Sequence, residues 1–337
     1  MSTLNDLTAL ALPTGSRLVA DESESRLCLS IEGQPLIQLR LTREPALQVL
    51  VEERFDHADN WAVWAACYWL FARAPACQRL TWHLDEAPTA ALLSGLLVPT
   101  EIVGQYRCER TLFWQLPQPW LGASQTSSCP QQLVISGGKR HPLRPVKPRG
   151  EVYRRFDARL GTWISLRTVD IDLDLARFNR WQNSPRVASF WQEEGSFEQH
   201  HEYLSKLEAD PHTLTLIGCF DDQPFAYFEA YWAKEDRIAP FYDADDYDRG
   251  IHMLVGEENH RGPHKVASWL SALTHYLFLD DPRTQRVVAE PRADNAKMIG
   301  HMQSQGFHCE KAFDFPHKRA ALMVLGRERF FDRCALA

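Results

Sequence analysis

Two side chains that can move protons stand near the ends of predicted strands. His252 lies within the apolar run 249–256, and Asp294 follows the apolar run 286–290. If the two strands are neighbours, their carboxyl ends open into one crevice, which is where open α/β sheets bind ligands. A histidine and a carboxylate there could act in general acid–base catalysis. Each also has a structural alternative, His252 as a core histidine and Asp294 as a helix N-cap.

A predicted helix start follows the strand that holds His252. Arg261-Gly262 forms a turn, and Pro263 suits the first helical position because its missing N–H would have no partner there. The free N–H groups of the first turn attract anions. Arg261, His264 and Lys265 add positive or potentially positive charge. The pattern indicates a pyrophosphate site, although every helix has such an N-terminus.

The elements that position these residues alternate between strand and helix periodicity. Predicted strands cover 162–168, 213–220, 224–232, 249–256, 286–290, 307–314 and 318–326, and predicted helices end near 181 or cover 196–209, 263–279 and 294–305. Ser196 and Gln199 have the spacing of a capping box. This order predicts an α/β (α+β) fold with a mixed sheet.

The first part of the chain contains a weaker version of the same order. We expect paired strands in 16–42, a helix over 61–74 capped by Asp59 or Asn60, a strand at 79–84, a short helix at 88–97 and a strand near 110–116. Six prolines make 117–150 an expected irregular linker. The predicted domains are therefore 1–116, the Pro-rich linker 117–150, and 151–337, and the first of them could be a degenerate duplicate of the last.

Composition narrows the class of protein. A net charge of -7 argues against non-specific nucleic-acid binding. We find neither an apolar run long enough to cross a membrane nor a signal peptide. The eight cysteines form no CxxC pair, so we expect reduced thiols and a cytoplasmic protein. No metal is expected, since His260 and His264 straddle the turn at Gly262.

Residues from about 150 to 330 resemble the GNAT superfamily of acyltransferases. The turn Arg261-Gly262 and its helix look like that superfamily's pyrophosphate signature, although the usual additional glycine is absent. A narrower resemblance, to siderophore-biosynthesis acyltransferases and above all to those that acetylate N6-hydroxylysine in the aerobactin pathway, rests on seven stretches in order. They are 151–157, 216–222, 227–232, 248–252, 284–288, 290–295 and 313–319.

The resemblance implies acetyl transfer from acetyl-CoA to the hydroxylamine nitrogen of N6-hydroxylysine, a small-molecule acceptor. It implies His252 and Asp294 as catalytic residues, with Asp294 orienting the histidine or stabilising its charged form. A histidine of ordinary pKa, about 6.5, would suit proton removal. The implied acetyl-CoA contacts are Leu254, Val255, Arg261, Gly262, Pro263, His264, Lys265 and Asn295, with a backbone N–H near Leu254 for the oxyanion. The implied acceptor contacts are Glu229, Trp232, Arg237, Asp248 and Arg249.

An acidic, aromatic loop at 233–248 predicts an acceptor lid. Its carboxylates would attract the α-ammonium of the acceptor, while Arg237 or Arg249 would meet the carboxylate; a solvated loop is the alternative. Other readings of the chain also stay open. The acceptor could be hydroxyornithine, hydroxycadaverine or hydroxyputrescine, the acyl group could be succinyl, or the chain could be a non-catalytic acyl-CoA-binding module. The N-terminal half could complete the cleft, pack as a pseudo-duplicate, or contact another siderophore-pathway enzyme.

Overall fold

The computed structural model describes residues 9–43, 47–55, 61–93, 95–122, 131–333 and 336. The predicted caps Asp59 and Asn60 lie outside these ranges. The chain divides into two compact units, each described by itself. One contains 1–119, 156–161 and 334–337, and the other contains 120–155 and 162–333.

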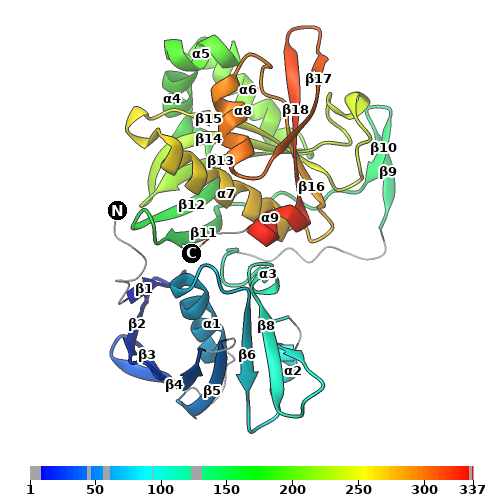
Figure 1. The fold of residues 1–337 in the computed structure, drawn as a ribbon. Helices are drawn as coiled ribbons and strands as arrows, with labels where there is room; N and C mark the ends of the chain where they lie inside the picture. The colour runs from blue at the N-terminus through cyan, green and yellow to red at the C-terminus, as the bar shows by residue number, and fades with distance from the viewer. Residues whose placement is uncertain are drawn as a thin grey trace. The chain divides into compact units, whose positions relative to one another are not determined.

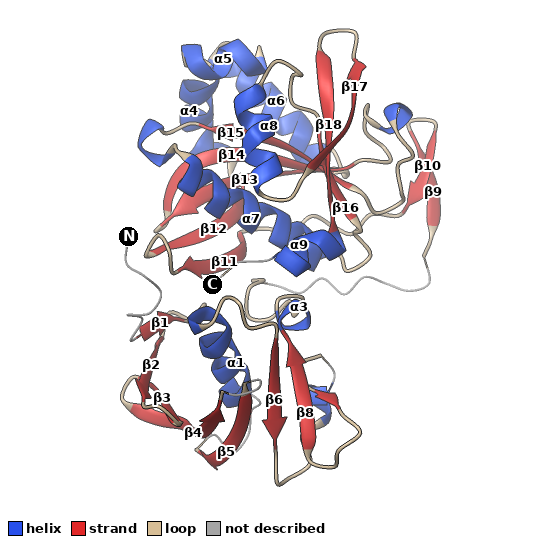
Figure 2. Ribbon diagram, viewed as in Figure 1, coloured by secondary structure: helices blue, strands red, loops and turns tan. Residues whose placement is uncertain are grey.

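An eight-stranded sheet forms the N-terminal unit (Figures 1 and 2). Its strands are β1 (Ala9–Ala11), β2 (Arg17–Glu22), β3 (Arg26–Ile31), β4 (Gln34–Thr42), β5 (Gln48–Arg54), β6 (Arg79–His83), β7 (Val98–Pro99) and β8 (Gln105–Glu109), in the order β1-β2-β3-β4-β5-β6-β8-β7. Only β5 and β6 are parallel, and α1 (Trp61–Arg73) connects them. The short helices are α2 (Ala90–Leu93) and α3 (Arg110–Phe113).

A second eight-stranded sheet forms the C-terminal unit. Its strands are β11 (Glu151–Asp157), β12 (Thr162–Thr168), β13 (Thr213–Phe220), β14 (Gln223–Trp232), β15 (Arg249–Val255), β16 (Arg286–Ala289), β17 (His308–Asp314) and β18 (Arg319–Gly326), in the order β11-β12-β13-β14-β15-β16-β18-β17. The helices are α4 (Ile171–Gln182), α5 (Pro185–Trp191), α6 (Phe197–Ala209), α7 (Pro263–Asp280), α8 (Ala296–Ser304) and α9 (Arg327–Arg333). The capping box of Ser196 and Gln199 is present.

The two sheets share one topology. In each, the fifth and sixth strands are parallel and joined by a long helix, and the last two strands exchange places in the order. The echo predicted for the N-terminal half is therefore present in its strand order. The difference lies between the second and third strands, where residues 23–25 replace the three helices α4, α5 and α6.

The C-terminal sheet has two covered faces. Leu175, Phe178 and Trp181 of α4 and Leu204 of α6 pack with Tyr227 and Leu254 on one face. On the other face, Trp269 of α7 stacks on Phe228 of β14 with ring centroids 5.3 Å apart. Because strand side chains alternate between faces, this assignment decides which residues can meet His252.

Two sequence predictions about the middle of the chain are wrong. The predicted strand 110–116 is instead β8 followed by α3, since the extended residues end at Glu109. The region expected to be irregular contains the hairpin of β9 (Leu133–Ser136) and β10 (Lys139–Pro142). Gly137 and Gly138, both at positive φ, make its two-residue turn. No helix in the described part of the chain is long and apolar enough to cross a membrane.

Candidate active site

β15 and β16 separate just where His252 stands. Their parallel pairing is confined to Arg249 with Val287 and Gly250 with Val288. His252 comes two residues later on β15, and Glu290 follows the last residue of β16. The register places both side chains on the face that also carries Glu229, which pairs with His252 across β14. The strands thus open a gap with these three side chains at its inner end.

Two glutamates hold the ring of His252. Its Nδ1 lies 2.8 Å from Glu229 Oε2 and its Nε2 lies 2.7 Å from Glu290 Oε1. Because a carboxylate can only accept, both ring nitrogens donate, which is the pattern of an imidazolium. The side chain of His252 is 22% exposed, whereas that of Glu290 is fully buried.

Tyrosines complete the hydrogen bonds of the two glutamates. Glu229 accepts from the hydroxyl groups of Tyr203, at 2.5 Å, and Tyr227, at 2.9 Å, while Glu290 accepts from Tyr231 at 2.8 Å. A Cβ on Gly250 would lie 1.9 Å from the Tyr231 ring, so only glycine leaves room for that ring. The carboxylates are therefore fixed before any acceptor arrives.

This environment changes the pKa values of the cluster. Burial lowers the pKa of His252, but the carboxylates of Glu290 and Glu229 outweigh it and raise the pKa to about 10. Burial likewise raises the pKa of Glu290, but His252 and Lys318 overcome that effect and hold it at about 2. The ordinary pKa expected for the histidine is therefore wrong. At neutral pH both nitrogens of the ring are protonated, and the group beside it that has no proton is a carboxylate.

Trp232 and Arg249, both expected at the acceptor, lie on the opposite face of the sheet. They pair with each other across β14 and β15, at positions of opposite parity to Glu229 and His252. The Arg249 guanidinium stacks 4.1 Å from the Trp232 ring centre and donates to Asp280 at 2.9 Å. Asp248 is also occupied, since it accepts from Tyr242, Arg286 and the backbone of Asp245. These three residues brace the start of β15.

Asp294 lies on the surface and pairs with Arg292, not with the ring that it was expected to orient. Its carboxylate receives two hydrogen bonds from Arg292, at 3.0 and 2.7 Å, and its side chain is 66% exposed. Both ring nitrogens of His252 are already taken by the glutamates. The N-cap of α8 is Asn295, whose side chain accepts from Met298 N, so the N-cap alternative for Asp294 is also wrong.

The turn and helix start predicted at Gly262 and Pro263 are present at the beginning of α7. Gly262 is the N-cap at φ +115°, Pro263 is the first helical residue, and the N–H groups of the next residues have no acceptor within the helix. Lys265 Nζ lies 4.5 Å above the Phe220 ring, next to His260 stacked on the same ring. A Cβ on Gly262 would lie 3.0 Å from the His264 ring.

Arg186 of α5 adds a charge that the sequence did not indicate. It donates to the carbonyl of Val255 at 2.7 Å. Burial and the nearby Arg261 lower its pKa. Its Nε is buried without a hydrogen-bond partner among the residues the structure describes. These donors and charges fit a pyrophosphate in chemical character.

The backbone of β15 supplies N–H groups at this gap. Gly256 N donates to Phe225 O at 2.9 Å, which makes their pair a hydrogen-bonded one. Such pairs alternate along an antiparallel ladder. The N–H of Leu254 therefore points to β14, and those of Met253 and Val255 point toward the gap. Of the N–H groups around Leu254, those directed at the gap therefore belong to its two neighbours.

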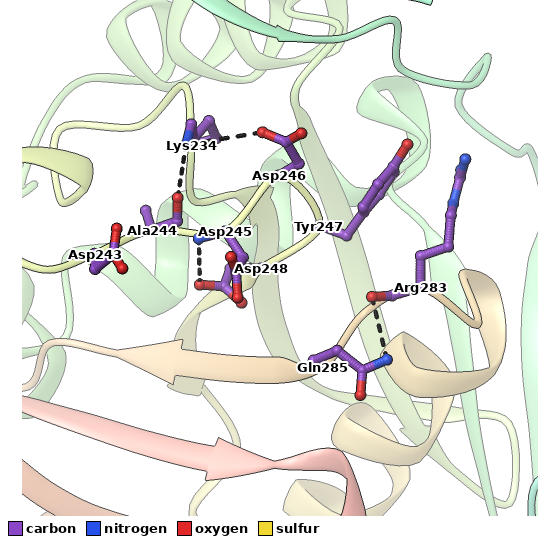
Figure 3. Close-up of a pocket in the computed structure, with 9 residues that line it drawn as sticks. All are labelled: Lys234, Asp243, Ala244, Asp245, Asp246, Tyr247, Asp248, Arg283 and Gln285. Atoms are coloured by element: carbon purple, nitrogen blue, oxygen red, sulfur yellow. Dashed lines mark hydrogen bonds and ion pairs between the residues drawn. The ribbon is translucent and has the colours of Figure 1, made fainter. Parts of the chain in front are cut away.

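The acidic loop lines a hollow of about 350 Å³ of its own (Figure 3). Lys234 crosses it, donating to Ala244 O at 2.8 Å and lying 3.7 Å from Asp246. Asp243, Asp245, Tyr247 and Arg283 contribute to its walls. Among the described residues that line it, neither His252 nor its two glutamates occurs. The loop therefore builds a separate hollow near the start of β15.

Arg237, from the same loop, does reach the histidine cluster. Its Nη2 lies 3.7 Å from Glu290 Oε1, and its guanidinium lies 5.4 Å from the Phe315 ring centre. Lys318, which follows the turn between β17 and β18, donates to Glu290 O at 2.7 Å. The sequence did not indicate Tyr203, whereas Glu290 and Lys318 lie within the stretches 290–295 and 313–319 that carry the resemblance. The pairing of Glu290 with His252 needs the register of β15 against β16.

Comparisons with known proteins agree with this geometry. Residues 170–315 match the model of the acetyltransferase (GNAT) domain. The chain is 44% identical over 253 residues to an N(6)-hydroxylysine O-acetyltransferase from Escherichia coli, covering 74% of this chain and 78% of that protein. It is 39% identical over 322 residues to a hydroxyornithine transacylase from Ajellomyces capsulatus, covering 92% and 68%.

One solved structure has a similar fold. An uncharacterized protein from Bacillus halodurans superposes with a TM-score of 0.53 at 29% identity, over 56% of this chain and 95% of that one. Within the described residues, no group of three or more His, Cys, Asp or Glu side chains is arranged so that it could hold a metal ion, and this includes Glu229, His252 and Glu290. By its fold and its relatives, the chain belongs to the GNAT acetyltransferases and is an acyl-CoA-dependent N-acyltransferase.

Proposed function

We propose that the protein transfers the acetyl group of acetyl-CoA to the hydroxylamine nitrogen of N6-hydroxylysine. The product, a hydroxamate, would serve as an iron-chelating arm in cytoplasmic siderophore biosynthesis. The observation that carries the proposal is the set Glu229, His252 and Glu290 at the inner end of the β15–β16 gap. The relatives named for hydroxylysine and hydroxyornithine support an N-hydroxy amino acid as acceptor.

The reaction needs no strong base to create the nucleophile. A hydroxylamine is a weaker base than an alkylamine, so its nitrogen is largely unprotonated near neutral pH. The nitrogen becomes acidic once it bonds the acyl carbon, and a carboxylate can then take its proton. We assign this proton to Glu290, which His252 holds in its charged form. His252 is then the group that fixes and electrostatically supports the base.

Backbone and side-chain donors would bind acetyl-CoA, the second substrate. The start of α7 with Arg186, Arg261 and Lys265 would hold the pyrophosphate of acetyl-CoA. The N–H of Met253 or Val255 would stabilise negative charge on the acyl oxygen, an effect of about 3 kcal/mol for one such donor. Asp294 and Asn295, which follow β16, would contact acetyl-CoA on its side of the gap.

The test is product analysis with the purified full chain, acetyl-CoA and N6-hydroxylysine, with lysine and N5-hydroxyornithine in parallel. We expect one acetyl group added to hydroxylysine and much less product from lysine. An N-acetyl product gives a coloured Fe(III) hydroxamate, whereas an O-acetyl product does not. An O-acetyl ester would overturn the proposed nitrogen acceptor, and faster turnover of hydroxyornithine would overturn the lysine assignment. Acetyl-CoA binding without any turnover would favour a non-catalytic binding module.

A further inference from the structure

A single oxygen of Glu290 is surrounded by three cationic side chains. Oε1 lies 2.7 Å from His252 Nε2, 3.7 Å from Arg237 Nη2 and 4.0 Å from Lys318 Nζ. The histidine forms a hydrogen bond, while the arginine and the lysine lie beyond hydrogen-bond distance from that oxygen. Because Glu229 also pairs with His252, the further cations that this one buried carboxylate faces are Arg237 and Lys318.

The positive charge of Arg237 is accessible to solvent. The Arg237 side chain is 52% exposed, and its long ion pair leaves the guanidinium fork free to take a second, bidentate partner. Lys318 is more enclosed, and burial together with the nearby Arg237 lowers its pKa. An additional anion between the two would relieve that repulsion. Phe315 lies under both cations, at 5.4 and 5.6 Å from its ring centre, and limits where they can move.

The backbone that carries Arg237 is tied down. Lys139 Nζ, on β10, donates to the carbonyls of Glu235 and Asp236, at 2.6 and 2.7 Å. Arg144, only 3% exposed, makes two hydrogen bonds to the Glu235 carboxylate. The guanidinium of Arg237 is therefore presented from a fixed segment, which lowers the entropy that binding would cost.

We infer that Arg237 and Lys318 bind the α-carboxylate of the acceptor, so that the enzyme selects amino-acid hydroxylamines over hydroxylated diamines. This inference rests on the proposed function and names the part of the acceptor that is recognised. Arg249, the other arginine considered for this role, faces the far side of the sheet and is paired with Asp280.

The distances suit such an acceptor. His252 Nε2 and Arg237 Nη2 lie 2.7 and 3.7 Å from the same oxygen, so they are no more than about 6.4 Å apart. Six bonds separate the hydroxylamine nitrogen of N6-hydroxylysine from its carboxylate carbon, and an extended chain of that length spans about 7 Å. With its hydroxylamine beside Glu290, an acceptor of that length would place its carboxylate beyond the shared oxygen, on the exposed side of the Arg237 guanidinium. Hydroxyornithine is one bond shorter, so these distances do not separate the two amino acids.

The experiment compares N6-hydroxylysine with its carboxamide, which has the same length without the negative charge, and with hydroxycadaverine. For the wild-type enzyme we expect kcat/KM for hydroxylysine to exceed that for the carboxamide by about 10- to 100-fold, the range for a charged hydrogen bond. Arg237→Ala and Lys318→Ala should each lower this ratio about tenfold, mainly through KM for hydroxylysine. Arg237→Lys should restore part of it.

Arg319→Ala is the matched control, since Arg319 lies on the same hairpin with its side chain 67% exposed. It should leave the ratio unchanged, and KM for acetyl-CoA should be constant throughout. A wild-type ratio near one would overturn the inference while leaving hydroxylamine acetylation intact. Equal losses with hydroxylysine and carboxamide in Arg237→Ala would also overturn it. Failure of the wild-type enzyme to acetylate any hydroxylamine would instead remove the proposed function.

Discussion

At the scale of single residues, the site depends on a histidine that is held rather than free. Both nitrogens of His252 donate to carboxylates, so the ring in the cluster Glu229–His252–Glu290 is doubly protonated and positively charged. A proton released by the acceptor would then have to go to a carboxylate, and in our proposal that carboxylate is Glu290.

The first prediction compares the two acidic candidates. Glu290→Gln removes the proposed proton acceptor and should lower kcat by about 10²-fold, the lower end of the usual contribution of a general base, because a carboxylate with a pKa of about 2 is a weak base. Asp294→Asn changes an exposed carboxylate paired with Arg292 and should lower kcat by much less. Steady-state kinetics with saturating acetyl-CoA would measure both. A larger loss in Asp294→Asn would return the catalytic role to Asp294.

The second prediction concerns pH. The pKa of His252 is raised to about 10 from an ordinary value of 6.5, so its stabilising effect is complete below pH 6.5 and is lost as the pH rises toward 10. The difference in free energy of unfolding between wild type and His252→Gln should therefore shrink between pH 7 and pH 10. Urea unfolding at several pH values would measure it. A difference that is constant across this range would mean an unshifted histidine.

At the scale of elements, the hairpin β9–β10 supports the acceptor side of the site. Lys139 and Arg144 hold the segment after β14 from which Arg237 projects. Arg144 also stacks on Trp232, 4.3 Å from its ring centre, so Trp232 lies between two guanidinium groups. A region that its prolines marked as a linker is thus a structural part of the C-terminal unit.

The third prediction follows from this contact. Lys139→Met removes the ammonium that binds two carbonyls but keeps the length of the side chain. We expect KM for the hydroxylamine to rise several-fold because Arg237 is less fixed, with KM for acetyl-CoA unchanged. Lys311→Met, on exposed β17, is the control. A change in the acetyl-CoA KM alone would contradict this role of the hairpin.

Particular residues explain how far the sequence could lead. Gly262-Pro263 predicts the start of α7, because both residues act through their own backbone. Gly137-Gly138 is likewise a local signal for a two-residue hairpin turn, although the surrounding prolines favour an irregular segment. Glu290 reaches His252 only through the register of β15 against β16, and Lys318 reaches Glu290 only through the turn of a distant hairpin. Asp294 and Asn295 are both good caps, and only the structure distinguishes them.

At the scale of the whole molecule, the two sheets repeat one topology but differ in what lies between the second and third strands. The helices α4, α5 and α6 bring Arg186, Trp191 and Tyr203 to the C-terminal site. The three-residue connection between β2 and β3 has no room for such a layer. The N-terminal unit therefore repeats the frame without the helices that enclose a site.

The fourth prediction distinguishes two boundaries of the C-terminal unit. A chain shortened to 120–333 keeps Arg144, whereas one shortened to 151–333 leaves the buried Glu235 without it. Breaking a buried ion pair costs about 3–5 kcal/mol. The shorter chain should unfold about 10 °C lower by calorimetry. Equal midpoints would contradict this, and Arg144→Ala in the full chain tests the same loss if neither fragment folds.

The meeting of three cations on one oxygen of Glu290 constrains how such an enzyme can diverge. A substitution that suits an acceptor with a different headgroup changes the electric field at the atom that fixes the histidine. A gain in affinity for the new acceptor is then accompanied by a change in rate. The number of methylene groups is free of this constraint, since it alters the span between the two ends but not their charges. Along such a lineage, acceptor length should therefore vary before acceptor charge does.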